Sequence, residues 1–277
     1  MRHKAHVPDL AKRILEHDRF EIHICFTSYR GHASQIARQA VMAGFDAVVA
    51  AGGDGSINEI ASELVGTQVA LGILPMGSGN GLAYKLGIPF DIEKALHTIN
   101  RYYTMRVDVG KVNEQYFFST MGIGFDALVV QDFHHNKLRG MWGYTQKILA
   151  HLFQYESETV AVAANGKIWR EKAFIVTAGN SGVYGYGIGM TAQTSDMHDG
   201  QFELVILRDF PRWKTPYILG MVSKGYLSSL KEAILIHTNE ASISTNQPTF
   251  VHIDGEAAPP AQHLHICLLP QALTVIM

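Results

Sequence analysis

Apolar positions in the first hundred residues follow two different spacings. Short apolar runs at residues 20–26, 45–51 and 69–74 have the length and composition of strands. Between them, apolar side chains recur at the three- and four-residue spacing of a helix face. The helix faces expected in this way are Val7, Leu10, Ala11, Ile14 and Leu15; Ala33, Ile36, Ala37, Ala40 and Val41; and Ile57, Ile60, Ala61 and Leu64. Strands that alternate with helices indicate a parallel sheet covered by helices.

The pattern changes after residue 101, where strand-like segments follow one another with few helices between them. Asn113-Glu114 and Asn165-Gly166 each separate two such segments, so both predict hairpins. Further strands are expected over residues 174–178, 202–207, 233–237, 251–253 and 264–269, and helices over 142–153 and 211–222. We therefore predict an α/β domain over residues 1–101 and a mainly antiparallel, β-rich domain over residues 102–264.

Composition narrows the class of protein. The chain has 277 residues, 47% hydrophobic and 17% charged, which is typical of a globular protein with its own core. A net charge of -2 gives no general attraction to nucleic acid, so no nucleic-acid partner is expected. Two cysteines imply no disulfide framework, and no apolar run approaches the ~18 residues that span a bilayer. A cytoplasmic protein without a transmembrane segment is the expectation.

The most informative stretch is a glycine-rich turn between a predicted strand and a predicted helix. Such a turn aims backbone N–H groups and the positive end of a helix at one point, which suits a phosphate. An aspartate there also suits Mg²⁺, which prefers oxygen ligands. The turn and the helix start comprise Gly52, Gly53, Asp54, Gly55, Ser56, Asn58 and Glu59.

A second turn of the same kind follows the next predicted strand. It contains Gly77, Ser78 and Asn80. The carboxyl ends of parallel strands meet at one sheet edge, where ligands usually bind. Neither turn fits the P-loop or the dinucleotide-binding fingerprint, so the sequence predicts a phosphate site of another kind.

These residues resemble a known family. The segment from Gly52 to Glu59 is similar to the GGDG signature of the diacylglycerol kinase catalytic domain family, which includes bacterial diacylglycerol kinases, sphingosine kinases and ceramide kinases. Residues 74–83 resemble its second loop, closest to the sphingoid and ceramide kinase form. Thr27 with Gly31-His32-Ala33, residues 196–200 and Asp254-Gly255-Glu256 match three further elements. The resemblance covers roughly residues 8 to 277.

The resemblance implies an ATP- and Mg²⁺-dependent lipid kinase. Residues 1–101 would form the nucleotide-binding domain, joined by a returning strand at about 265–277. Residues 102–264 would bind the lipid, with the active site in the cleft between the domains. Thr27 would contact ATP beside the two glycine turns. Bacterial lipid kinases imply Glu256 as the catalytic base, with Asp54 organising phosphate and Mg²⁺, whereas sphingosine kinases imply Asp54 as the base. Taken alone, Asp254-Gly255 is also typical of a β-turn.

Two further sites rest on the same resemblance. Asp199, with the backbone carbonyls of Asp196 and Gln201, matches a structural Mg²⁺ site, although a turn before the next strand would explain these residues equally well. Asp126 lies where sphingosine kinases place a carboxylate near the lipid head group. An N-cap of the following helix would also explain Asp126.

Several alternatives stay open. Family members usually begin with a strand and an Asn-Pro-x-Ser-Gly turn, whereas this sequence starts in the helix that would follow. A catalytically impaired nucleotide- or lipid-binding regulator is therefore one alternative. Sphingoid-base or ceramide kinases, and NAD kinases with a related GGDG turn, are others. Diacylglycerol or a related lipid, reached at the membrane surface by a peripheral protein, is the preferred substrate, and a homodimer is left open.

Overall fold

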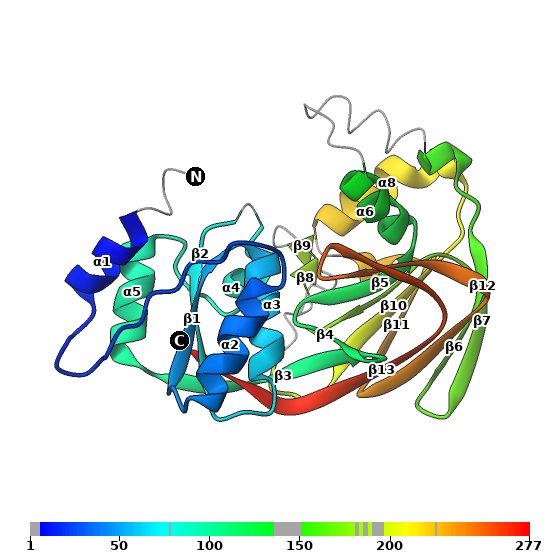
Figure 1. Cartoon of the computed structure of the whole chain (residues 1–277). Coiled ribbons are helices and arrows are strands. Elements are labelled where there is room, and N and C mark those ends of the chain that lie inside the picture. Colours follow the sequence, from blue (N-terminus) through cyan, green and yellow to red (C-terminus); the bar gives the residue numbers. More distant parts are fainter. Residues whose placement is uncertain are drawn as a thin grey trace. The chain divides into compact units, whose positions relative to one another are not determined.

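The computed structural model describes residues 6–77, 79–135, 151–180, 183–184, 188–189, 197–224 and 226–277 (Figure 1). The chain divides into two compact units. Unit 1 comprises Met1–Val109 and Pro270–Met277, and unit 2 comprises Gly110–Leu269. The predicted fold class, an α/β part followed by a mainly antiparallel β part, is confirmed.

Unit 1 is a small parallel sheet with helices packed on it. Strands β1 (Ala47–Gly52) and β2 (Ala70–Pro75) pair in parallel from Ala47 opposite Ala70 to Gly52 opposite Pro75. The end of β13 (Glu256–Ile276) joins them in parallel, with Val275 opposite Leu71. Figure 1 shows α1 and α5 on one side of β1 and β2, and α2 and α3 on the other. The helices of unit 1 are α1 (Val7–Ile14), α2 (His32–Met42), α3 (Asp54–Leu64), α4 (Gly81–Lys85) and α5 (Ile92–Arg101).

The core of unit 1 follows from its sequence pattern. All six residues of β2 are buried, as expected for a strand covered on both faces. The α3 face predicted from helical spacing supplies Ile57, Ala61 and Leu64, each with 0% exposure. The Asp91 side chain caps α5 by accepting a hydrogen bond from the Lys94 N–H at 3.0 Å.

The predicted strand over residues 20–26 is wrong. These residues have no regular secondary structure, and Phe26 is 69% exposed. A strand persists only where a neighbouring backbone accepts its hydrogen bonds, and in the described part of the chain no strand pairs with this segment. Alternation of apolar residues alone was therefore not sufficient to predict a strand in this segment. Cys25, expected in that strand, is exposed.

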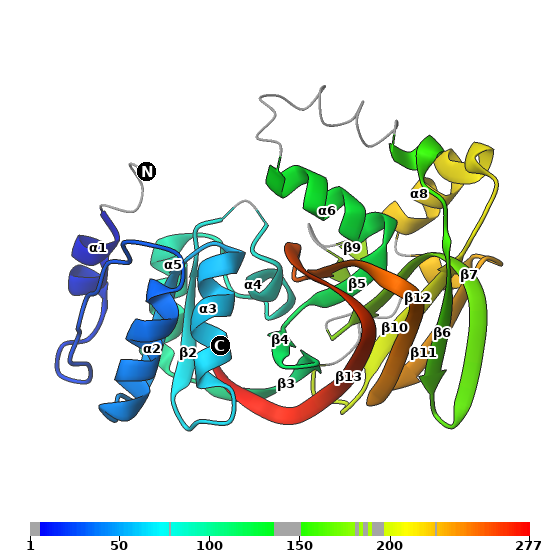
Figure 2. The ribbon, with the colours of Figure 1, turned by 45° about the vertical axis from the view of Figure 1, so that its right-hand side comes forward.

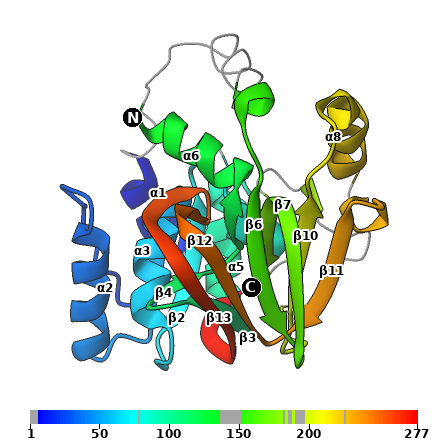
Figure 3. The same cartoon turned by 90° about the vertical axis from the view of Figure 1, so that its right-hand side faces the viewer.

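Unit 2 is built from antiparallel strands. The two predicted hairpins are confirmed, and the backbone at Asn165-Gly166 has the positive φ values, 48° and 71°, of a tight two-residue turn. Strands β6, β7, β10 and β11 lie side by side (Figure 3). The strands are β3 (Thr104–Val112), which starts in unit 1, β4 (Gln115–Phe117), β5 (Thr120–Gly124), β6 (Glu158–Ala164), β7 (Lys167–Gly179), β8 (Val183–Tyr184), β9 (Ile188–Gly189), β10 (Phe202–Arg208), β11 (Ala233–Thr238), β12 (Glu240–Ile253) and most of β13.

Two apolar clusters cover opposite faces of the strands in unit 2. Along β10, Leu204 and Ile206 belong to one cluster, and Val205 and Leu207 belong to the other. This alternation follows from the two-residue period of a strand. The second cluster is closed by residues of α6 (Phe125–His135) and α8 (Thr215–Ser223), which Figure 2 shows on one side of the sheet.

The remaining helical segments complete unit 2. Short 3-10 turns, η3 (Arg212–Lys214) and η4 (Leu227–Ser229), flank α8, so the helix predicted over 211–222 is largely confirmed. For the helix predicted over 142–153, residues 151–154 are helical, and residues 142–150 lie outside the described residues. Among the helices that the structure describes, none has the length and apolarity needed to cross a bilayer.

Candidate active site

The two glycine-rich turns lie beside each other at the carboxyl ends of β1 and β2. The last register pair is Gly52 with Pro75, and the Met76 N–H continues the ladder to the Gly52 carbonyl at 2.8 Å. Beyond this point the backbones touch. A Cβ added at Gly77 would lie 2.6 Å from the Gly53 Cα, so a side chain at position 77 cannot fit without moving one turn. The sequence-based expectation that both turns open at one sheet edge is met.

The Asp54 carboxylate fastens the second turn to the first. One oxygen accepts the Asn80 N–H at 2.8 Å, and the other accepts the Gly81 N–H at 2.7 Å. Hydrogen bonds to a charged acceptor each contribute roughly 1.5–3 kcal/mol. A Cβ at Gly79 would lie 2.7 Å from the same carboxylate, so the glycine keeps this contact possible. Asp54 therefore has a structural task that the sequence did not reveal.

The second turn is also held from within by Asn80. This residue has a positive φ of 53° and is 6% exposed. Its amide oxygen accepts the Gly77 N–H and its amide nitrogen donates to the Gly77 carbonyl, both at 2.8 Å. The Asn80 side chain thus shapes the turn. Ser78, between these residues, lies outside the described residues.

The first turn leads into the N-terminus of α3. The N-cap residue is Gly53, and no side-chain cap hydrogen bond is formed there. Gly55 and Ser56 lie in the first helical turn and are partly buried. The first backbone N–H groups of a helix have no partner within the helix and carry its positive dipole end, so this end of α3 can receive an anion.

Glu59 connects α3 to the upstream element that contains Thr27. The Glu59 carboxylate accepts the Gly31 N–H at 2.9 Å, and the Glu59 carbonyl accepts the Ser34 hydroxyl at 3.1 Å. Gly31 has a φ of 84°, which favours glycine. Thr27 is exposed in the segment that leads to this point, and Asn58 is partly buried on α3. Glu59 therefore positions the upstream segment against α3.

In unit 2, Glu256 begins β13 directly after a tight hairpin turn. Asp254 and Gly255 have φ values of 50° and 78°, and Ile253 is paired with Glu256 across the turn. The turn expected from Asp-Gly is thus present, and it fixes the backbone position of Glu256, which is partly buried.

Asp254 anchors this hairpin to the chain before β5. Its carboxylate accepts the N–H groups of Phe118, Ser119 and Thr120 at 2.9, 2.7 and 2.9 Å. Burial raises the pKa of the Asp254 carboxyl, and the three N–H donors act in the opposite direction. The sequence indicated no role for Asp254 itself, because its partners lie more than a hundred residues away along the chain.

Asp126 forms a buried pair with His252. The His252 Nε2 lies 3.0 Å from one Asp126 oxygen, and the side chains are 4% and 16% exposed. The other oxygen of Asp126 accepts the Ala127 N–H at 2.8 Å. A Cβ at Gly122 would lie 2.7 Å from both groups, so the glycine makes room for the pair. The sequence shows His252 beside the Asp254-Gly255-Glu256 element but gives it no partner, because only the pairing of β12 with β5 brings it to Asp126.

The predicted structural Mg²⁺ site is only partly described. Asp199 accepts the Gln201 N–H with one carboxylate oxygen at 2.9 Å, which is typical of a turn. Asp196 lies outside the described residues. Within the described ranges, no three His, Cys, Asp or Glu side chains are grouped as a metal site. The residues present supply oxygen ligands compatible with Mg²⁺, chiefly the second Asp199 oxygen.

Comparison with known families covers nearly the whole chain. The family profile described as "Diacylglycerol kinase catalytic domain" matches residues 2–112. The profile described as "YegS C-terminal NAD kinase beta sandwich-like domain" matches residues 119–277. The glycine turns and the Asp254 hairpin each fall within one of these matches.

Individual relatives agree with the profiles. A diacylglycerol kinase of Bacillus subtilis is 31% identical over 238 residues, 83% of this chain and 77% of its own length. A diacylglycerol kinase of Staphylococcus aureus is 26% identical over 258 residues, which are 91% of this chain and 81% of the relative's own length.

Solved structures share the fold. A diacylglycerol kinase structure from Bacillus anthracis has a TM-score of 0.73 at 21% identity, covering 97% of this chain and 90% of that one. The structure of an NAD kinase from Archaeoglobus fulgidus in complex with ATP has a TM-score of 0.55 at 12% identity. The match covers 99% of this chain and 89% of the NAD kinase chain. From its sequence matches, this chain belongs to the diacylglycerol kinase catalytic domain family and is a lipid kinase.

Proposed function

We propose that this lipid kinase transfers the γ-phosphate of ATP to the hydroxyl of diacylglycerol or a related lipid at a membrane surface. The observation that carries the proposal is the Asp54 carboxylate, which holds two glycine turns together at the start of α3. Backbone N–H groups at a helix start and in a neighbouring turn favour binding of a chain of phosphate groups. The relatives named diacylglycerol kinase support the acceptor, and the NAD kinase that holds ATP supports the nucleotide.

In this proposal the backbone of unit 1 holds the nucleotide. N–H groups at the start of α3 and in the second turn, including Ser78, would bind the β- and γ-phosphates, with Thr27 beside them. Each Asp54 oxygen accepts one hydrogen bond and has a second lone pair, so the carboxylate can also hold a water or Mg²⁺. Bound Mg²⁺ would neutralise charge on the transferred phosphoryl group.

Unit 2 would supply the acceptor side of the reaction. A free alcohol is a weak nucleophile, so a carboxylate base within hydrogen-bond reach is expected. We assign this role to Glu256, because the Asp254 anchor gives its hairpin a fixed backbone. Asp126 would contact the lipid head group, and Asp199 with Asp196 and Gln201 would hold a structural Mg²⁺. These assignments require the two units to face one cleft during turnover.

Identifying the phosphorylated lipid tests the proposal. The protein is incubated with γ-labelled ATP, Mg²⁺ and an equal mixture of diacylglycerol, sphingosine and ceramide, and the labelled product is identified. We expect label on diacylglycerol. Label only on a sphingoid lipid would favour the sphingoid or ceramide kinase alternative, to which the loop over residues 74–83 is most similar. No transfer to any lipid, with ATP still bound, would indicate a regulator and overturn the proposal.

The base is tested by Glu256→Gln, which keeps the shape and removes the charge. We expect transfer to fall by at least about 100-fold, the lower end of the contribution of a general base. ATP affinity should remain within about twofold, because Glu256 is not among the proposed phosphate contacts. Glu240→Gln, on an exposed glutamate of β12, is the matched control. A near-normal rate for Glu256→Gln would refute the assignment.

A further inference from the structure

Four exposed apolar side chains lie on and beside α8. They are Trp213, Tyr217, Leu219 and Tyr226, which are 77%, 59%, 60% and 44% exposed. We call these four residues the α8 surface. They lie within a stretch of fourteen residues and come from η3, α8 and the segment before η4. Single exposed apolar residues are ordinary, but a group of this kind indicates an interaction site.

The outward face of α8 lacks the polar side chains of an ordinary surface helix. Ile218 points inward and is 3% exposed, whereas Pro216, Tyr217, Leu219 and Gly220 are exposed. No residue of α8 is charged. A helix on the surface of a globular protein normally places charged residues opposite its core face. A Cβ at Gly220 would meet no atom within 4 Å, so this face is open at its centre.

The charge around the α8 surface differs from that of the whole protein. Residues 209–232 contain four basic and two acidic side chains, whereas the chain as a whole has a net charge of -2. The two acidic residues are already paired, since Asp209 contacts Arg212 and Glu232 contacts Lys214. The stretch of residues 209–232 therefore has a formal charge of +2, and its two exposed lysines are Lys224 and Lys231.

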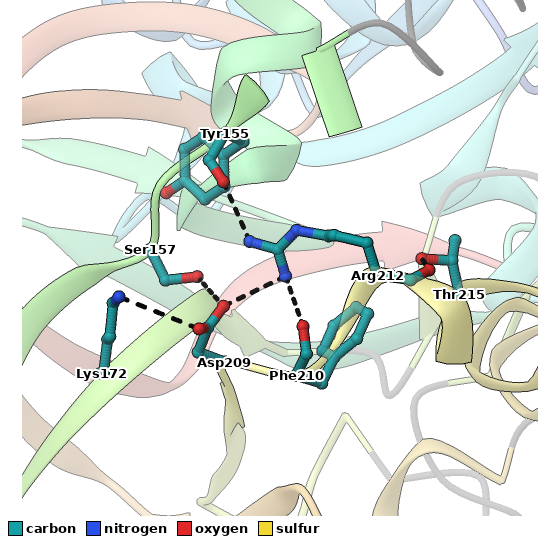
Figure 4. A network of polar contacts seen from close by, with 7 residues as sticks. All are labelled: Tyr155, Ser157, Lys172, Asp209, Phe210, Arg212 and Thr215. Carbon is teal, nitrogen blue, oxygen red and sulfur yellow. Dashed lines mark hydrogen bonds and ion pairs between the residues drawn. The ribbon is translucent and has the colours of Figure 1, made fainter. Parts of the chain in front are cut away.

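A network beneath η3 holds the surface in place (Figure 4). The Arg212 guanidinium donates to the carbonyls of Phe210 and Tyr155 at 2.8 and 2.9 Å and lies 4.8 Å from the centre of the Phe174 ring. Thr215, the first residue of α8, donates its hydroxyl to the Arg212 carbonyl at 2.7 Å. The exposed Trp213 thus stands on a fixed turn, which lowers the entropy lost when it binds.

We propose that the α8 surface docks the enzyme on an anionic lipid bilayer. Tryptophan and tyrosine favour the interface between lipid and water, leucine enters the acyl region, and nearby lysines attract anionic head groups. Anionic head groups complement the exposed Lys224 and Lys231, whereas a second copy of the chain would present the same two lysines, so the bilayer is the better partner. The inference rests on the proposed function, since a lipid substrate brings the protein to a membrane.

Vesicle flotation tests the docking surface without ATP or substrate. The protein is floated with vesicles of equal parts phosphatidylglycerol and phosphatidylcholine, and with phosphatidylcholine alone. The test variant is Tyr217→Ala with Leu219→Ala. The matched control is Ile168→Ala, an exposed apolar residue of β7 with 62% exposure, close to the 60% of Leu219. Melting temperature and sedimentation velocity are measured for each variant.

We expect wild type and Ile168→Ala to float with the anionic vesicles, and the double variant to bind them at least about tenfold more weakly, about 1.4 kcal/mol. Its melting temperature, and its rate on a short-chain diacylglycerol dissolved in water, should be unchanged. Equal flotation of the double variant, equal binding to both vesicle types, or a change in oligomeric state would overturn the proposal. If no lipid is phosphorylated while flotation depends on the α8 surface, the proposed function fails separately.

Discussion

Two substitutions of Asp254 should destabilise unit 2 by different amounts. One oxygen of the Asp254 carboxylate accepts the N–H groups of Ser119 and Thr120, and the other accepts that of Phe118. Asp254→Asn keeps one acceptor oxygen for the first pair but places an amide NH₂ against the Phe118 N–H. Asp254→Ala removes all three acceptor contacts.

The magnitudes follow from the number of donors left without a partner. Each buried donor without an acceptor costs about 1–3 kcal/mol. We therefore expect Asp254→Asn, which leaves one donor without an acceptor, to lower the free energy of unfolding by about 1–3 kcal/mol, and Asp254→Ala, which leaves three, by about 3–9 kcal/mol. A domain of ordinary stability has only about 5–15 kcal/mol, so the alanine variant should be strongly impaired.

Urea denaturation followed by circular dichroism measures both changes, with Glu114→Ala, an exposed glutamate in a hairpin turn, as the control. The rate of lipid phosphorylation should fall in the same order, because the Asp254 anchor positions the hairpin that carries Glu256. An alanine variant within about 0.5 kcal/mol of wild type, the range of ordinary surface substitutions, would refute the anchoring argument.

Three further predictions concern other parts of the molecule. Gly77→Ala forces the glycine turns apart and should weaken ATP binding at least about tenfold in a calorimetric titration; Gly220→Ala, where a Cβ meets open space, should bind ATP normally and gain up to about 1 kcal/mol of stability. Partial burial raises the pKa of Asp209, but the Ser157 hydroxyl and the charges of Arg212 and Lys172 outweigh it, so the net pKa lies below the ordinary value. This carboxylate therefore stabilises the fold above the unfolded-state pKa, and the contribution is lost as pH falls through the lower folded-state pKa. Melting temperatures measured down to about pH 2 should fall less steeply for Asp209→Asn than for wild type; parallel curves would contradict this. Asp126→Asn should raise the KM for the lipid more than it lowers kcat, and the reverse pattern in steady-state kinetics would exclude a head-group role.

Much of the fold could be predicted because local signals agree with one another. The run before Gly52, the glycines after it and the helical spacing of Ile57, Ala61 and Leu64 each indicate part of one strand–turn–helix unit. Asn165-Gly166 predicts its hairpin because few residues tolerate positive φ at both turn positions. In both segments the conformation is determined by residues that are close together in the sequence.

Prediction from the sequence failed where a residue's conformation or contacts depend on partners far away along the chain. Residues 20–26 alternate like a strand but have no paired backbone among the described residues. The orientation of Asp54 toward the second turn depends on β1 lying beside β2, and the task of Asp254 depends on the strand order of unit 2. Side chains of this kind can be named from sequence, but their contacts come only from the fold.

The central claim is that the Asp54-linked turns hold ATP while Glu256 serves the acceptor hydroxyl. A crystal structure with Mg²⁺ and a non-hydrolysable ATP analogue tests it most directly. We predict the triphosphate against the backbone N–H groups at the start of α3 and in the second turn, with the Glu256 carboxylate within hydrogen-bond reach of the acceptor position at the γ-phosphate. A triphosphate bound away from these turns, or a Glu256 remote from the γ-phosphate, would contradict the account.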